Sequence, residues 1–280
     1  MRSPPGQSLV NTPRIELWPA WLLRARSNHD ARALSGADTV LRRKRDGRFL
    51  AADSRAGLMP LLPRLGREPG LDAALDALDA MHSRAAPCRS GIAREVATLP
   101  LSRLQERLET LGLDAEAYAA RTQLELVPEP ERLDFAGFDR WRRPLWLLAP
   151  ASRAWARMRE AAGRDGIVVE AISGYRSHDY QLGIFERKLA RGQTVDGILA
   201  VNAAPGFSEH HTGTALDIGT PDEPPAEESF ERTPAFAWLQ ANAGGYGFAM
   251  SYPRNNPHGI VYEPWHWRFN FNQPDRKESP

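Results

Sequence analysis

The sequence predicts an α+β fold, in which a small antiparallel sheet with flanking helices follows a mostly helical N-terminal region. Three observations support this prediction. Apolar residues recur at three- and four-residue spacing in the first part of the chain, aromatic residues crowd in after residue 130, and short apolar runs then alternate with helical patterns. The stretch VPEPERLD, residues 127–134, has the proline-rich and acidic composition of a linker. We therefore divide the chain into residues 1–130, whose role the sequence leaves open, and residues 131–280, a candidate catalytic domain.

The expected elements follow the chain in order. In the first region, residues 41–50 have the pattern of a solvated hairpin, and residues 71–82 and 102–112 have helical spacing. In the second region, Ser177 and Thr233 are suitable N-caps, each directly before a helical pattern. There we expect helices over residues 150–163, 177–192 and 233–247 and a strand over residues 213–220. Residues 166–177 have the pattern of a strand that leads into a loop, and residues 259–269 begin as a strand.

The composition excludes several classes of protein. A formal net charge of +1 across 280 residues argues against a protein that binds nucleic acid through bulk charge, so we expect no nucleic-acid partner. The single cysteine, Cys88, permits neither an intramolecular disulfide nor a cysteine-based zinc site. No stretch reaches the roughly 18 apolar residues that a membrane-spanning helix needs, and the N-terminus does not have the pattern of a signal peptide. The oligomeric state stays open.

The stretch SEHHTGTALD, residues 208–217, carries two candidate metal ligands. Asp217 lies in the middle of an expected strand, where an aspartate is unfavourable unless it is paired or binds a cation. Gly213 and Ala215 share its face of the strand, because side chains repeat every two residues, and they leave room for an ion. His210 precedes the strand. Imidazole and carboxylate are ligand types that catalytic zinc accepts, and such a site keeps one position for water.

The stretch EPWHWR, residues 263–268, supplies a third ligand and a base. Glu263 and His266 are three residues apart, so one turn can direct both side chains into one cavity. If His266 binds zinc, Glu263 is placed to take a proton from a water molecule whose pKa the zinc lowers toward about 7. The carboxylate would then pass the proton to a leaving amine.

The stretch SGYRSHDYQ, residues 173–181, supplies candidate groups for the substrate. Attack on an amide builds negative charge on its oxygen, and a fixed donor should stabilise that charge. Arg176 lies between an expected strand and the following helix, and its guanidinium suits an oxyanion or a terminal carboxylate. Gln181 lies one turn into that helix and would add a second donor.

These three motifs, in this order, resemble those of the LAS metallopeptidases, the VanY-type zinc D-alanyl-D-alanine carboxypeptidases and their dipeptidase relatives of peptidase family M15. The resemblance covers about residues 133–269. It implies a fold of the Hedgehog/DD-peptidase type, one Zn²⁺ per chain, and a peptidoglycan peptide as substrate. It also implies roles for individual residues: His210, Asp217 and His266 as zinc ligands, Glu263 as the catalytic base, Arg176 at the polarised carbonyl, and Gln181, Ser208 and Tyr175 as substrate-binding residues.

The expected reaction is release of a terminal D-alanine from peptidoglycan stem peptides or their precursors. Two alternatives stay open at this point. One is an endolysin-like endopeptidase that cuts an L-Ala–D-Glu bond, and the other is a non-catalytic, zinc-containing binding module. Retention of Glu263 argues against the binding module, which has no need of a base. The substrate implies the cell envelope or periplasm, but the sequence shows no export signal, so a cytoplasmic location also stays open.

Overall fold

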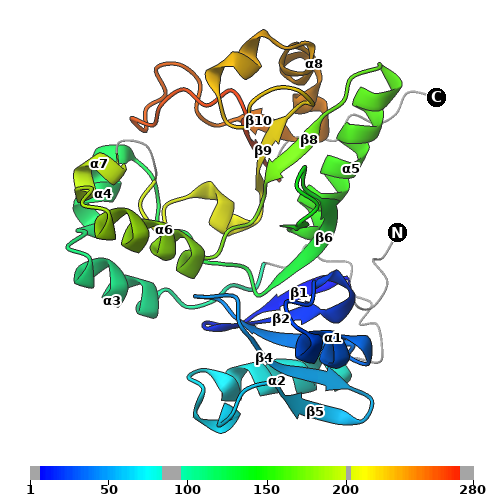
Figure 1. Ribbon diagram of the computed structural model, residues 1–280. Helices are drawn as coiled ribbons and strands as arrows, with labels where there is room; N and C mark the ends of the chain where they lie inside the picture. The colour runs from blue at the N-terminus through cyan, green and yellow to red at the C-terminus, as the bar shows by residue number, and fades with distance from the viewer. Residues whose placement is uncertain (1–6, 84–95, 200–202, 272–280) are drawn as a thin grey trace. The chain divides into compact units, whose positions relative to one another are not determined.

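A computed structural model describes residues 7–83, 96–199 and 203–271. The chain divides by internal contacts into two compact units (Figure 1). The first unit contains Met1–Pro100 and Glu129–Asp134, and the second contains Leu101–Pro128 and Phe135–Pro280. Cys88 lies outside the described residues.

The first unit is built on an antiparallel sheet, which the expectation of a mostly helical N-terminal region did not include; the described part of residues 1–130 also contains four α-helices. Its strands lie in the order β5-β4-β3-β2-β1, and β1 also pairs with the start of β6. The bounds are β1 (Ser8–Asn11), β2 (Ile15–Pro19), β3 (Thr39–Arg43), β4 (Phe49–Ser54), β5 (Gly57–Pro60) and β6 (Arg132–Phe138), with helices α1 (Asn28–Ser35) and α2 (Leu71–Ser83) and the short 3₁₀ turns η1 (Ala20–Leu22) and η2 (Leu65–Arg67). Consecutive residues of β2, β3 and β4 are buried, so these strands lack the alternation of polar and apolar residues that would have indicated them.

The predicted hairpin over residues 41–50 is confirmed, because β3 and β4 pair antiparallel across the turn. It is only partly solvated. Lys44 turns inward and forms an ion pair with Glu129, and both side chains are buried. A buried charge is stable only when it is paired, so this contact ties the hairpin to the segment that follows residue 128.

The second unit contains the predicted small antiparallel sheet. Its strands are β8 (Glu170–Ser173), β9 (Ala215–Gly219), β10 (Phe248–Met250) and β11 (His266–Phe269), in the order β10-β11-β9-β8. Leu216, Ile218 and Trp267 pack into a core with α5 (Ala149–Arg164) and α8 (Pro234–Asn242), the helices that flank this sheet in Figure 1. The α+β architecture is therefore confirmed. The strand expected within residues 166–177 is present as β8 and leads into a loop, whereas the strand expected at the start of residues 259–269 lies at the end of that stretch, as β11.

A second core of this unit joins four helices. These are α3 (Ser102–Thr110), α4 (Ala115–Thr122), α6 (His178–Ala190) and α7 (Val195–Leu199). Residues 101–128 thus belong with the catalytic part of the chain, although the sequence placed them before a boundary at residue 130. The remaining elements are β7 (Pro144–Leu147) and the 3₁₀ turns η3 (Glu209–Thr212), η4 (Glu228–Arg232) and η5 (Ala243–Tyr246). Within the described ranges, every helix is too short or too polar to cross a bilayer.

Candidate metal centre and substrate cleft

The register of β9 against β11 places two of the predicted ligands opposite each other. Asp217 and His266 are direct cross-strand partners, and Leu216 pairs with Trp267 one position along. Because side chains alternate between the two faces of a sheet, Asp217 and His266 share the face opposite to Leu216 and Trp267, which pack in the core. The cross-strand pairing therefore builds half of the candidate site.

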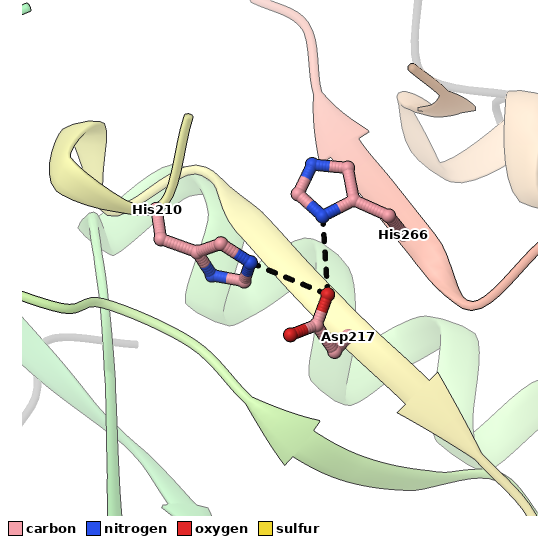
Figure 2. A group of neighbouring side chains, drawn as sticks. All are labelled: His210, Asp217 and His266. Atoms are coloured by element: carbon pink, nitrogen blue, oxygen red, sulfur yellow. Dashed lines mark hydrogen bonds and ion pairs between the residues drawn. The ribbon is translucent and has the colours of Figure 1, made fainter. Parts of the chain in front are cut away.

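The third predicted ligand reaches the same point from η3. Gly213 follows η3 with φ of 69°, a left-handed conformation that glycine adopts without strain, and the chain then enters β9. His210 Nε2 lies 3.2 Å from Asp217 Oδ1, and His266 Nδ1 lies 3.1 Å from the same oxygen (Figure 2). One ligand atom from each residue lies within 4.8 Å of the others, and all three residues are buried.

Groups behind the two imidazoles fix their orientation. His210 Nδ1 lies 2.7 Å from the carbonyl oxygen of Gly174 and must carry the hydrogen, because a carbonyl can only accept. A Cβ at Gly174 would meet Leu145 Cδ1 at 2.6 Å and the Trp146 carbonyl oxygen at 3.1 Å, so a larger residue here would displace its neighbours. His266 Nε2 lies 2.9 Å from Glu209 Oε2. Metal-binding histidines almost always have such a partner on their other nitrogen.

This arrangement fits a bound cation. With its hydrogen on Nδ1, His210 turns the lone pair of Nε2 toward an Asp217 oxygen that is itself an acceptor. His210 Nε2 is buried and makes no hydrogen bond to any described residue. Two acceptors that face each other at 3.2 Å in a buried site repel unless a positive charge lies between them. A divalent metal would supply that charge.

Burial and the neighbouring charges separate the pKa values of the two imidazoles. Burial, aided by the Arg176 charge, lowers the pKa of His210 to about 4, so this ring is neutral at pH 7. Burial also acts to lower the pKa of His266, but hydrogen bonds to Asp217 and Glu209 outweigh it and raise this pKa to about 10. In the metal-free chain, His266 therefore holds a proton on the nitrogen that faces Asp217.

Glu263 lies beside this cluster. The turn before β11 is held by a hydrogen bond from the His266 amide to the Glu263 carbonyl, and Glu263 Oε2 lies 3.9 Å from His266 Nδ1. Burial raises the pKa of Glu263 to about 7, against the opposing effect of the His266 charge. A carboxyl group with a pKa near neutrality can both accept and return a proton at working pH.

The candidate ligands open into a cleft of about 300 Å³. Its lining residues are Arg176, Gln181, Ala203, Ser208, His210, Asp217, Ala226, Tyr252, Ile260, Val261, Glu263, Trp265 and His266. The Arg176 guanidinium reaches within 3.9 Å of Asp217 Oδ2. Gln181 was expected to offer a donor, but its Nε2 donates to the carbonyl of Ala203, 3.1 Å away. Tyr175 is not among the lining residues, so its role in substrate binding stays a prediction.

Glu209 and Tyr252 belong to this site although the sequence analysis did not select them. Glu209 bridges His266 Nε2 and Arg268 Nη1, at 2.9 Å from each. The Tyr252 ring packs on the His266 ring with centroids 4.8 Å apart. An acidic residue next to a predicted ligand was the available signal for Glu209. Nothing in the sequence around Tyr252 indicated its position.

Comparison with known proteins agrees with the geometry. Residues 145–272 match the VanY family, described as D-alanyl-D-alanine carboxypeptidase. Residues 145–272 therefore resemble a VanY-type domain. The resemblance inferred from the three motifs is therefore confirmed, and the VanY-type domain contains every residue to which a role was assigned.

Several known proteins are similar to part of this chain. The YodJ protein of Bacillus subtilis (strain 168), which carries a provisional name as a carboxypeptidase, is 33% identical over 176 residues, which cover 60% of this chain and 63% of YodJ. A D-alanyl-D-alanine carboxypeptidase of Enterococcus faecium is 36% identical over 99 residues, 35% of this chain and 28% of the relative. The solved structure of the LdcB LD-carboxypeptidase is 36% identical, with 44% of this chain and 59% of that chain covered and a TM-score of 0.42. This chain thus spans less than two thirds of the length of each.

Proposed function

We propose that this protein is a zinc-dependent peptidase that releases a terminal D-alanine from peptidoglycan stem peptides or their precursors. One observation carries the proposal: His210 Nε2, Asp217 Oδ1 and His266 Nδ1 converge in a buried site beside a cleft. The match to the VanY family and the names of the enterococcal relatives support the substrate class.

Two imidazoles and one carboxylate form a ligand set suited to catalytic zinc, because they leave a coordination position for water or substrate. Zinc in this position would supply Lewis-acid chemistry, polarising a carbonyl and making water more acidic. The outer partners Gly174 and Glu209 would hold the two imidazoles in the orientation that binding needs.

The chain's own residues account for the remaining requirements of peptide hydrolysis. Glu263 would accept a proton from the attacking water and deliver it to the leaving amine, for which a pKa near 7 is well matched. Arg176 would stabilise the negative charge that develops on the carbonyl oxygen. Ser208 lines the same cleft and would contact the C-terminal end of the peptide, while Gln181 would hold the cleft wall through Ala203.

The reaction can be identified from its products. Purified muropeptides are incubated with the zinc-loaded protein, with and without a chelator, and the products are measured by mass spectrometry. Loss of one alanine, abolished by the chelator and restored by zinc, is the expected result. A split stem peptide would indicate the endopeptidase instead, and intact muropeptides under all conditions would contradict the proposal.

Substitution of Glu263 separates the enzyme from a non-catalytic binding module. Glu263→Ala should abolish hydrolysis while zinc content stays near one per chain, because the carboxylate is assigned to proton transfer and not to metal binding. Glu263→Gln is the matched variant that keeps the side-chain volume, and it should be equally inactive. An unchanged rate in either variant would refute the assigned base.

A further inference from the structure

His211, the residue after the proposed ligand His210, contacts the main chain of Arg176. His211 lies in η3 and is fully buried, with an exposed fraction of 0%. Both nitrogens of its ring are engaged by main-chain groups. His211 Nδ1 lies 2.6 Å from the carbonyl oxygen of Arg176, and the Gly206 amide donates to His211 Nε2 at 3.1 Å.

These two partners allow one tautomer. The Gly206 amide can only donate, so His211 Nε2 must present a lone pair. The Arg176 carbonyl can only accept, so His211 Nδ1 must carry the hydrogen. A neutral imidazole satisfies both bonds at once, and its rigid ring keeps the two main-chain segments at a fixed separation.

Arg176 is held through its main chain, whereas its guanidinium has no close hydrogen-bond partner among the described residues. The Arg176 amide donates to the His210 carbonyl at 3.3 Å, so His210 and His211 together bind both the N–H and the C=O group of the Arg176 main chain. The guanidinium lies 3.9 Å from Asp217 Oδ2, which is beyond hydrogen-bond distance. Arg176 Nε is buried and makes no hydrogen bond to any described residue.

His178 supports the same ring from the first turn of α6. The two imidazoles meet edge to face, with centroids 4.5 Å apart and an interplanar angle of 81°. His178 Nε2 lies 2.9 Å from the Val127 carbonyl, and the Val127 amide donates to the Gly206 carbonyl at 2.8 Å. Val127 precedes the part of the chain that matches the VanY family, so this support comes from outside the match.

We propose that His211 is a positioning residue that sets the location of the Arg176 guanidinium through the Arg176 main chain. This inference rests on the proposed function, in which Arg176 stabilises the transition state. A displacement of about 1 Å at such a group can cost about 100-fold in rate, so the hydrogen bond from His211 to the Arg176 carbonyl contributes to turnover and not only to stability.

Two substitutions of His211 each keep one of its two main-chain hydrogen bonds. An asparagine amide nitrogen can occupy the place of Nδ1 and donate to the Arg176 carbonyl, so His211→Asn keeps the bond to Arg176. A glutamine oxygen can occupy the place of Nε2, so His211→Gln keeps the bond from Gly206. We expect His211→Gln to lower kcat roughly 10- to 100-fold with little change in KM, and His211→Asn to stay within a few-fold of the unchanged protein.

A double-mutant cycle with Arg176→Ala tests whether His211 acts through Arg176. In the Arg176→Ala background, His211→Gln should cause no further loss of kcat, because the group that it positions is gone. Equal losses in the Asn and Gln variants that follow their thermal stability, or losses that add to that of Arg176→Ala, would overturn the proposal and leave His211 with a structural role alone.

A measurement that needs no activity keeps this inference separate from the proposed function. In ¹⁵N-labelled full-length protein, the Nε–H resonance of Arg176 should be preserved in His211→Asn and shifted or broadened in His211→Gln. An unchanged resonance in both variants would refute the positioning role even if the enzyme is active. If the unchanged protein does not hydrolyse muropeptides but the resonance responds as expected, the proposed function fails while the positioning contact stands.

Discussion

Replacing Glu209 should weaken zinc binding although Glu209 is not one of the three proposed ligands. Its Oε2 lies 2.9 Å from His266 Nε2, and its Oε1 lies 2.9 Å from Arg268 Nη1. The carboxylate is nearly buried, with 12% of the side chain exposed, so water can replace little of what it provides. Its pKa is lowered to about 2, because the bond and charge of His266 outweigh the effect of burial, and it is ionised at neutral pH.

The expected magnitude follows from the type of hydrogen bond. A bond to a charged group contributes about 1.5–3 kcal/mol and a neutral bond about 0.5–1.5 kcal/mol. Glu209→Gln keeps an acceptor for His266 but loses the charge, a difference of about 1–1.5 kcal/mol, so Kd for zinc should rise roughly tenfold. Glu209→Ala removes the acceptor, and Kd should rise toward about 100-fold, the upper range for outer partners of metal ligands.

The assay is a competition titration of the metal-free protein against a chromophoric zinc chelator at fixed pH. Arg268→Gln is the matched control, because it removes a contact to Glu209 Oε1 while the bond from Oε2 to His266 stays in place. Its Kd should change much less than that of the Glu209 variants. Equal Kd values for Glu209→Ala and the unchanged protein would refute the idea that Glu209 orients His266 for the metal.

Three further predictions follow from the described contacts. Zinc uptake at pH 7 should release about one proton from His266, because its pKa of about 10 leaves it protonated in the metal-free chain. The affinity for zinc should then rise roughly tenfold per unit rise in pH. Calorimetry that gives the same heat of binding in buffers of different ionisation enthalpy would contradict this proton release. Asp217→Ala should lower bound zinc sharply by elemental analysis, and full occupancy would show that the ligand set is wrong. Lys44→Ala should destabilise the first unit by about 3–5 kcal/mol in urea unfolding, whereas replacing Lys44 and Glu129 together with apolar residues should recover most of the loss; a single variant as stable as the parent would refute the buried pair.

The second unit could be predicted well because its signals are local. The helix with Ser177 as N-cap is present as α6, and the serine accepts a hydrogen bond from the Tyr180 amide. The motif around His210 and Asp217 indicated a metal site because aspartate in a strand among small residues is unfavourable without a partner. What local sequence could not show was the register that sets Asp217 against His266, since that pairing joins residues 49 positions apart.

The features that the sequence analysis missed also depend on contacts between residues that are distant in the chain. The strands of the first unit are short, and Ala51 and Ala52 in β4 are small residues with weak strand preference that are buried by tertiary packing. Gln181 was assigned a donor role from its spacing; its Nε2 donates one hydrogen bond to the Ala203 carbonyl, which folding brings near, and the role toward the substrate stays a prediction.

The interleaving of the two units along the chain limits how the protein can be shortened. A cut near residue 100 would deprive the N-terminal sheet of residues 129–134, which pair with β1 and include the carboxylate that neutralises Lys44. A cut near residue 135 would remove α3 and α4, whose apolar side chains cover α6 and Phe207. Neither unit can be excised intact by one cleavage, so a fragment trimmed to the VanY match alone would expose apolar surface and should aggregate.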